Sequence, residues 1–420
     1  MFVVSKQSFP NLSYNIGMFS FFSKDKTELG VVFDIGSSSV GVGLVKFKRD
    51  KAPQIIYTAR KAIPYQESVK PERFLVDMIK TLDSVHELVH KEGLAHLKFT
   101  EYGNHKIRHA FYAFSSPWAA SQTKIASVEH KDSVIVTHDM IDDIVMKAEK
   151  TFEAEVVDPA KSSDFKSNLT IIEKRVIQIR LNGYEIRNPY NKEAKNVSVS
   201  FFISLVPKVV TDSVSEASLG ALHPRDTHFV SSQLASYSVL KDTVSGQDDF
   251  VLLDVGGEVS DVSVVKNDLI LETASFPLGK NFLIRQVSRA LAVTNDGALS
   301  LIRLYYSGHA DKEVSESIRP VLENASREWI GALHTVLTQI TGTLSLPQEL
   351  FIVLNGDLTP FFMKAIREEK VSQFDVVEVP FRVTLVNHDL LKQYVSFSSS
   401  AKNDSNVALL TIFTSRMLDI

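Results

Sequence analysis

The sequence has no cysteine among its 420 residues. This absence excludes disulfide bonds, thiolate metal sites and a cysteine nucleophile. Long hydrophobic runs are missing too, because no apolar stretch approaches the roughly 20 residues that a membrane-spanning helix needs. The start has neither a basic segment nor a small-residue cleavage site, so we do not expect a cleavable signal peptide. We therefore expect a soluble protein of the cytoplasm.

A strong net charge is also missing. The chain carries 46 Lys and Arg against 50 Asp and Glu, which gives a formal net charge of −4. This balance gives no electrostatic reason to expect a nucleic-acid partner. With 44% hydrophobic residues, the chain can bury one large core or two lobes.

Residues 1–28 form a polar and aromatic lead without clear periodicity. We expect this lead to be disordered, or to be upstream sequence before a start at Met18. In an alternative interpretation, the aromatic rings and lysines of Phe19–Lys26 touch a membrane that carries anionic headgroups. That alternative would place the protein at the inner face of the cell membrane.

The most informative stretch is Phe250–Gly279, in which apolar runs are separated by Asp, Gly and Asn. Such runs predict consecutive strands joined by tight turns. The first run ends on Asp254, followed by Gly256 and Gly257. A turn of the form Asp-x-Gly-Gly lets backbone N–H groups approach a ligand with no side chain in the way. Alternatively, the glycines serve turn geometry alone and the acid caps the turn.

A second copy of this pattern lies near the start, in Leu29–Lys46. An apolar strand ends on Asp34-Ile35-Gly36, three serines follow, and a strand returns. We name Asp34–Ser39 the first corner and Asp254–Asp261 the second corner. If the corners face each other, their amides and hydroxyls can hold phosphate oxygens, and Asp34 and Asp254 can hold a hydrated divalent cation.

With both corners in order, the sequence resembles the actin-like ATPase superfamily, and within it the FtsA/PilM family of bacterial actin-like ATPases. The resemblance covers residues 29–415. It implies an α/β, actin-like (ribonuclease H-like) two-lobed fold with an inserted α+β subdomain. It also implies ATP and Mg²⁺ as ligands, protein partners, and self-association into filaments.

The resemblance implies a role for particular residues. Asp34 and Asp254 would hold magnesium through water. Asp254 and Gln233 would be catalytic, although Ser232 stands at the family's acid or amide position and Gln233 lies next to it. The implied cofactor contacts are the residues that would cradle phosphates, hold the metal or leave room for adenosine: Asp34, Gly36, Ser37, Ser38, Ser39, Gly256, Gly257, Ser260 and Gly356.

The implied domain organisation alternates between the two lobes. The connecting helix corresponds to Phe229–Leu240, and Asn406–Thr414 is expected to be a strand. The segments are a lead at 1–28, the first part of the first lobe at 29–105, the FtsA-type insert at 106–207, the lobe return and connecting helix at 208–249, the second lobe at 250–400, and a C-terminal strand and tail at 401–420.

The insert decides between two members of the family. An FtsA-like role in bacterial cell division is favoured, because the insert resembles the FtsA subdomain over a long stretch. The alternative is a PilM-like protein of type IV pilus assembly, which the first corner fits as well. A small-molecule kinase of this fold is less expected, because no catalytic base with a sugar pocket is evident. An exposed strand edge in the insert could pair with another chain.

Several positions depart from the family pattern. Gly41 replaces a lysine that meets phosphates, Glu258 replaces a small residue, and Leu299 and Ile302 stand where polar groups would contact the base. Each lost charge-assisted contact removes about 1.5–3 kcal/mol where it is desolvated. We therefore predict a scaffold with weak or absent hydrolysis, an ATPase at most. Alternatively, Glu258 and Asp34 share a metal and nucleotide binding stays intact.

Membrane attachment by a C-terminal amphipathic helix is not expected. The tail after Thr414 is too short for such a helix.

Overall fold

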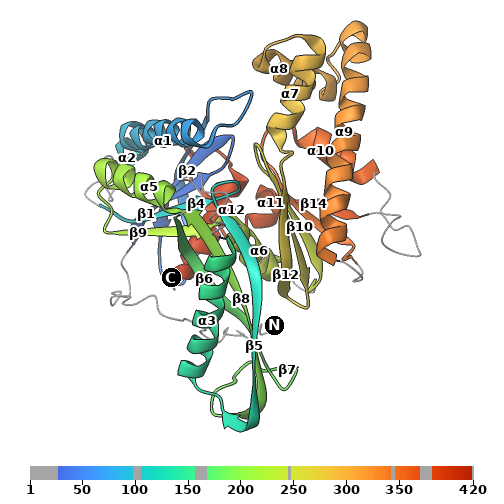
Figure 1. Cartoon of the computed structure of the whole chain (residues 1–420). Coiled ribbons are helices and arrows are strands. Elements are labelled where there is room, and N and C mark those ends of the chain that lie inside the picture. The colour runs from blue at the N-terminus through green and yellow to red at the C-terminus, as the bar shows by residue number, and fades with distance from the viewer. Residues whose placement is uncertain are drawn as a thin grey trace, which may run out of the picture.

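The computed structural model describes residues 27–97, 106–156, 168–244, 247–341, 346–368 and 381–418. Figure 1 shows two lobes side by side and a third unit that projects below them. Each unit is built on its own sheet, with six, five and four strands. Residues 1–26 of the predicted lead at 1–28, with its alternative start and membrane anchor, lie outside the described residues, whereas Glu28 is the first residue of strand β1.

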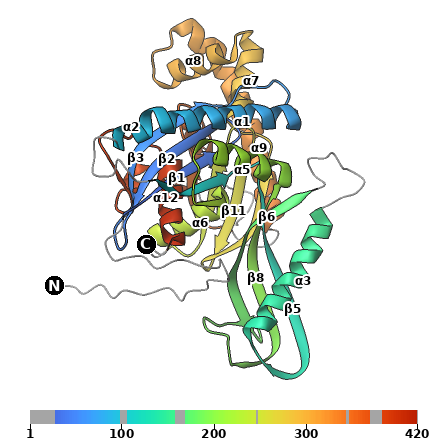
Figure 2. The same ribbon diagram turned by 90° about the vertical axis from the view of Figure 1, so that its left-hand side faces the viewer.

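The first lobe contains a mixed sheet in the order β15-β3-β2-β1-β4-β9. Its central strand β1 is buried on both faces, which explains its continuous apolar sequence. Helices α1 and α5 cover one face, while α6 and α12 pack on the other. Figure 2 shows α1 lying across this sheet. The elements are β1 (Glu28–Ile35), β2 (Ser39–Phe47), β3 (Gln54–Ala62), α1 (Pro71–Leu88), η1 (Val89–Gly93), α2 (Leu94–Leu97), β4 (Ile107–Phe114), α5 (Lys208–Ala221), β9 (Asp226–Ser231), α6 (Ser232–Thr243), β15 (Ser396–Phe397) and α12 (Ser405–Met417).

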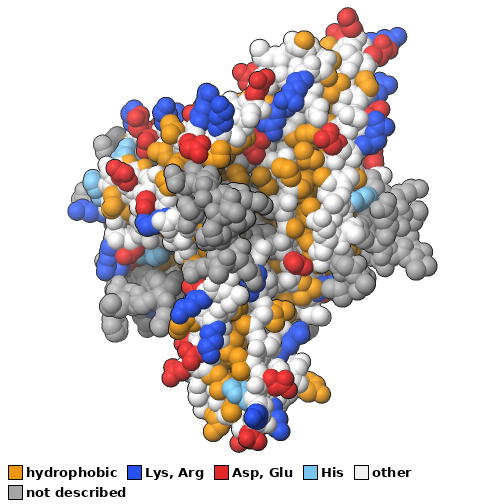
Figure 3. Space-filling model, in the orientation of Figure 1, with side chains coloured by type: hydrophobic (Ala, Val, Ile, Leu, Met, Phe, Trp, Pro, Cys, Tyr) orange, Lys and Arg blue, Asp and Glu red, His pale blue; other side chains and the backbone are white. Residues whose placement is uncertain are grey.

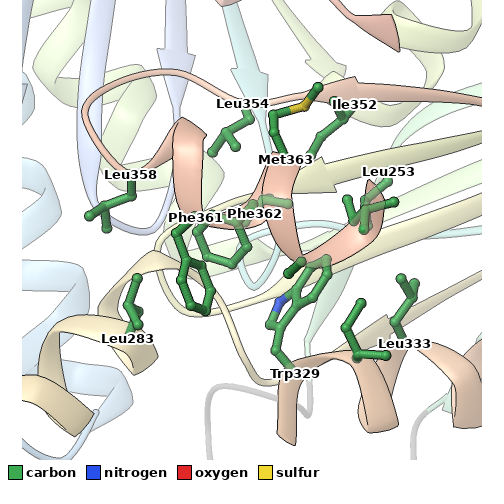
Figure 4. Close-up of a cluster of buried hydrophobic side chains, with 14 of the residues drawn as sticks. Leu253, Leu283, Trp329, Leu333, Ile352, Leu354, Leu358, Phe361, Phe362 and Met363 are labelled. Carbon is green, nitrogen blue, oxygen red and sulfur yellow. The ribbon is translucent and has the colours of Figure 1, made fainter. Parts of the chain in front are cut away.

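The second lobe contains a sheet in the order β12-β11-β10-β13-β14. Its core is the cluster in Figure 4, where Trp329 and Leu333 of α9 face Phe361 and Phe362 of α10. The elements are β10 (Phe250–Val255), β11 (Ser260–Lys266), β12 (Leu269–Phe276), α7 (Lys280–Leu291), α8 (Asn295–Tyr306), α9 (Lys312–Thr341), β13 (Glu349–Val353), α10 (Thr359–Glu368), β14 (Arg382–Leu385) and α11 (His388–Leu391).

The third unit is the predicted α+β insert. Its sheet has the order β5-β8-β6-β7, and α3 packs its apolar side against this sheet. Figures 1 and 2 both show the unit projecting away from the lobes. Its elements are β5 (Ala120–Ile135), α3 (His138–Val156), β6 (Leu169–Leu181), β7 (Tyr184–Glu185) and β8 (Glu193–Pro207).

Three segments differ from the sequence-based boundaries. Strand β4, expected in the insert, pairs in parallel with β1 in the first sheet. Strand β15, expected in the second lobe, pairs with β3 of the first. The connecting helix begins only at Ser232, because the residues before it form β9 beside β4. These pairings join distant segments, which local periodicity does not report.

The prediction of a C-terminal strand at Asn406–Thr414 is wrong, because this run lies inside helix α12. Its β-branched residues resemble a strand, and burial on all sides removes the helical pattern of apolar and polar positions. The helix packs against α6 and against β1, β2 and β3. Asp404 is its N-cap residue and accepts a hydrogen bond from Val407 N. Within the described residues, no helix is long and apolar enough to cross a membrane.

Candidate functional site

The two corners face each other across a cavity of about 240 Å³ between the lobes. This confirms the central geometric prediction from the sequence. The cavity brings together all the predicted cofactor contacts except Ser260, and it includes Asp254: Asp34, Gly36, Ser37, Ser38, Ser39, Asp254, Gly256, Gly257 and Gly356.

The first corner is a tight turn between β1 and β2. Gly36 N donates to Ser39 O at 3.1 Å, which closes the turn. The buried indole of Trp118 donates from Nε1 to Gly36 O at 2.9 Å, and its ring stacks on Phe74. The corner is therefore fixed from behind by a rigid aromatic side chain.

The second corner is closed by Gly256 N, which donates to Val259 O at 3.0 Å. The first amides of α7 then bond to this turn, with Lys280 N donating to Gly256 O at 2.9 Å. These amides have no partner within their own helix, so the turn satisfies them. A Cβ at Gly279 would lie 2.4 Å from Gly257 O, so this close packing requires glycine.

The corners touch each other directly. Ser37 Oγ accepts hydrogen bonds from Gly257 N and Glu258 N, both at 2.9 Å. A Cβ at Gly257 would lie 2.6 Å from Ser38 N, so the two backbones approach more closely than any side chain would permit. The amides that the sequence reading assigned to phosphate oxygens already have an acceptor from the other lobe.

Ser260 does not reach the cavity, which corrects its prediction as a phosphate contact. Its hydroxyl is buried and donates to Leu278 O at 2.7 Å. Gln233 does not line the cavity either, and its Nε2 donates to Ser263 Oγ at 2.9 Å. The structure therefore gives no geometry for its predicted catalytic role.

Arg60 is the main residue that sequence reasoning missed. Its Nη2 donates to Asp34 Oδ2 at 2.7 Å and its Nε donates to Asp404 Oδ2 at 2.8 Å. Its Nη1 donates to Ser39 Oγ at 2.9 Å. Burial alone would lower the pKa of Arg60, but the two carboxylates outweigh this and raise it, so the guanidinium is charged.

The β2–β3 register explains how Arg60 reaches this place. Gly41 is paired with Arg60 across the antiparallel strands. A Cβ at Gly41 would lie 2.4 Å from Arg60 Nη2, so the glycine provides the space that the guanidinium occupies. The cation absent at position 41 is replaced by a cation from the neighbouring strand.

The charges around Asp254 are balanced differently. Burial raises the pKa of Asp254 to about 8, and Asp261 and Asp34 add to this rise. Lys280 lines the same cavity, and its pKa is lowered by burial and by Arg60. Lys280 Nζ donates a long hydrogen bond of 3.4 Å to Asn355 O.

The residues present do not fit the predicted magnesium site. Asp34 already accepts hydrogen bonds from Arg60 Nη2 and from Asn406 Nδ2, so protein groups occupy and neutralise this carboxylate. In the part of the chain that the structure describes, no group of three or more His, Asp or Glu side chains could hold a metal ion.

The alternative in which Glu258 shares a metal with Asp34 is wrong. The Glu258 carboxylate accepts from Arg285 Nη2 at 2.6 Å and from Asn281 Nδ2 at 2.7 Å. It therefore serves as an ion-pair partner for α7.

The predicted adenosine turn also lines the cavity. Gly356 has φ +97°, a left-handed conformation that favours glycine. Next to it, Asp357 forms an ion pair with Arg303 of α8. Ile302 is fully buried in the core of the second lobe, so it does not replace a base contact.

Comparison with known proteins identifies the fold. No family model matches the sequence, and no curated protein matches it. The structure of a PilM-PilN type IV pilus biogenesis complex matches with a TM-score of 0.53 and 14% identity, covering 94% of this chain and 98% of that chain.

Two further solved structures match less closely. A Bacteroides thetaiotaomicron protein with actin-like ATPase fold matches with a TM-score of 0.39 and 11% identity, covering 94% of this chain and 99% of that chain. A MamK double helical filament matches with a TM-score of 0.42 and 10% identity, covering 93% and 99%. The chain has the mixed α/β, two-lobed actin-like ATPase fold.

Proposed function

We propose that the protein is an actin-like scaffold of the PilM kind, which acts in type IV pilus assembly by binding protein partners. The observation that carries this proposal is the similarity to PilM over 94% of the chain. In the sequence the insert favours an FtsA-like role in cell division, whereas the structural match over 94% of this chain and 98% of the matched chain supports the PilM-like alternative.

The cleft supports a scaffold rather than an ATPase. The Ser37 hydroxyl bonds to the amides of the second corner, and Arg60 bonds to Asp34. Both sets of groups would have to be released before a magnesium-bound triphosphate entered. We therefore propose weak or absent hydrolysis.

The insert offers a surface that supports partner binding. β5 is at the end of its sheet and pairs with β8 alone among the described strands. Near its start, Ser121 O accepts a hydrogen bond from Thr273. Beyond this contact, Ile125 and Ile135 are 68% and 56% exposed. A strand edge with exposed apolar side chains can accept an extended segment of another protein.

The space-filling view agrees with this placement. Figure 3 shows hydrophobic side chains exposed on the insert, between its charged groups. We propose that an extended segment of a partner of the PilN kind pairs with the β5 edge.

The test of the pilus role is deletion of the gene in its native host. Loss of surface pili with normal septation supports the proposal. Retained pili together with filamentous, undivided cells would reverse the choice in favour of FtsA.

The test of the β5 edge is calorimetric titration with the PilN-like protein of the same host. Ile125→Lys places a charge on the edge, so we expect binding to weaken at least tenfold. Met146→Lys on α3 is the matched control, because Met146 is also an exposed apolar residue of the insert, at 46%, but belongs to a helix and not to the edge strand. Equal affinity of both variants and the wild type would exclude β5 as the docking edge.

A further inference from the structure

We infer that the chain carries its own substitute for a magnesium nucleotide. The Ser37 hydroxyl occupies the position of a phosphate oxygen, and the Arg60 guanidinium occupies the position of the cation. Together with Asp404 they form what we call the internal clamp, which holds the lobes closed without a ligand. This inference deepens the proposed function, because it rests on the claim that the cleft does not turn over ATP.

The phosphate side of the clamp is the bond from Ser37 to the second corner. Two successive backbone amides that converge on one point form an anion-binding nest. Here Gly257 N and Glu258 N converge on Ser37 Oγ, each at 2.9 Å. Ser37 is only 2% exposed, so the nest is shielded from solvent as well as filled.

The cation side of the clamp is the guanidinium between two carboxylates. Arg60 bonds to Asp34 at the end of β1 and to Asp404 at the start of α12. Asp404 also accepts from Asn355 Nδ2 of the second lobe at 3.2 Å. Arg60 therefore links both lobes through Asp404 and neutralises the carboxylate that would otherwise attract a divalent cation.

The remaining space agrees with a filled site. Pockets that enclose small ligands usually measure about 300–1,000 Å³. The cavity here measures about 240 Å³ and is bounded on one side by the touching corners. A nucleoside triphosphate could enter this site only if the two corners separated.

A second set of contacts closes the lobes beside the clamp. Arg285 of α7 forms its ion pair with Glu258 and donates a long hydrogen bond of 3.5 Å to Gln66 O of the first lobe. Its guanidinium also lies 5.6 Å from the centre of the Tyr65 ring. Ser116 Oγ of the first lobe donates to Asp261 Oδ1 at 2.7 Å. Protein groups thus supply the contacts between lobes.

The experiment measures the distance between lobes in the full chain. Because the sequence has no cysteine, Glu72→Cys and Ser300→Cys introduce two labelling sites without background, and both positions are exposed. Spin-label distance measurements then report lobe closure. We expect one narrow distance distribution that millimolar ATP with magnesium leaves unchanged, and no heat of ATP binding by calorimetry.

Two variants test the clamp itself. Arg60→Ala leaves Asp34 and Asp404 without their arginine partner, so we expect a broader distribution of spin-label distances. Because magnesium ions can then neutralise the two carboxylates, magnesium chloride alone should narrow this distribution again. Gly41→Ala removes no polar group but displaces the guanidinium, and we expect it to broaden the distribution as well. Gly331→Ala is the matched control, because a Cβ there meets nothing within 4 Å. It should leave the distance distribution unchanged.

Two results would overturn the inference. One is saturable binding of ATP and magnesium by the wild type at micromolar concentration, and the other is an unchanged narrow distribution in Gly41→Ala. If Arg60→Ala does not fold, Gly41→Ala alone decides. Intact pili after deletion of the gene in its native host would refute the pilus role, but they would not bear on the internal clamp. Failure of one proposal can therefore be distinguished from failure of the other.

Discussion

The first corner turns its hydroxyl into the cleft, whereas the second corner turns its hydroxyl into the core of its own lobe. Ser37 follows Gly36 at the tip of the turn and reaches the opposite lobe. Ser260 is the first residue of β11 and donates to Leu278 O within its own lobe. The hydroxyl of Ser37 at the tip of the turn therefore connects the two lobes, whereas the hydroxyl of Ser260 in β11 supports its own lobe.

Each of the two tryptophans of the chain supports one of the two corners. Trp118 donates to Gly36 O behind the first corner, and Trp329 donates to Leu278 O behind the second. Both side chains are almost completely buried, at 2% and 0% exposure. Each corner is therefore supported by a buried indole that donates one hydrogen bond.

The largest expected effect follows from removing the support of the second corner. Trp329→Ala should lower the free energy of unfolding by about 3–5 kcal/mol, because it empties the centre of the core in Figure 4. Denaturant titration followed by circular dichroism measures this loss. Trp329→Phe is the control, and its loss of unfolding free energy should be clearly smaller. A smaller loss for Trp329→Ala than for Trp329→Phe would contradict the packing argument.

A smaller effect compares the two hydroxyls. Ser37→Ala leaves two buried amides without an acceptor and should cost about 1–3 kcal/mol of unfolding free energy. Ser260→Ala should cost about 0.5–1.5 kcal/mol, because Leu278 O keeps its hydrogen bond from Trp329. Equal losses of unfolding free energy in chemical denaturation would show that the hydrogen bonds of Ser37 between the lobes contribute no more than the hydrogen bond of Ser260 within one lobe.

The acid of the second corner also predicts a pH dependence of stability. The pKa of Asp254 is raised from 3.8 to about 8, so the folded state holds this proton more tightly than the unfolded chain does. The contribution of Asp254 to the free energy of unfolding is therefore fully present below pH 4 and is lost as the pH rises through about 8. Asp254→Asn should gain about 1–2 kcal/mol over the wild type at pH 8.

This gain should disappear in acid. Unfolding curves of Asp254→Asn and the wild type should nearly coincide below pH 4. A constant difference across the whole pH range would mean that titration of this carboxyl is not its source.

The smallest effect concerns the exposed ion pair beside the adenosine turn. Arg303 and Asp357 are 50% and 51% exposed, so water screens their attraction. Arg303→Ala should change the free energy of unfolding by about 0–1 kcal/mol. A loss as large as that of Ser37→Ala, in the same denaturant assay, would indicate that this pair also fastens the cleft.

Local pattern was sufficient for much of the fold. Apolar residues at helical spacing and a proline in the first turn are local signals, and they mark α1 (Pro71–Leu88) as a helix. The two corners were found because strand, acid and glycine lie within a few residues. The run at Asn406–Thr414 failed for the opposite reason: α12 is enclosed on all sides, so no amphipathic pattern marks it as a helix.

The charge network of the site could not be predicted from local pattern. Arg60 lies 26 residues from Asp34 and 344 residues from Asp404, and only the paired register of β2 and β3 brings it into the cleft. Gly41 was interpreted as the loss of a cation, whereas it makes room for one. A glycine opposite an arginine on adjacent strands is the signal that would have found it.

The separation of 344 residues between Arg60 and Asp404 has a consequence for biosynthesis. A ribosome that adds about 5–20 residues per second delivers the second carboxylate roughly 20–70 s after the arginine. Throughout that interval the emerging chain has only Asp34, one of the two carboxylate partners of Arg60. Translation speed therefore sets how long chaperones have access to the nascent protein before its first lobe is complete.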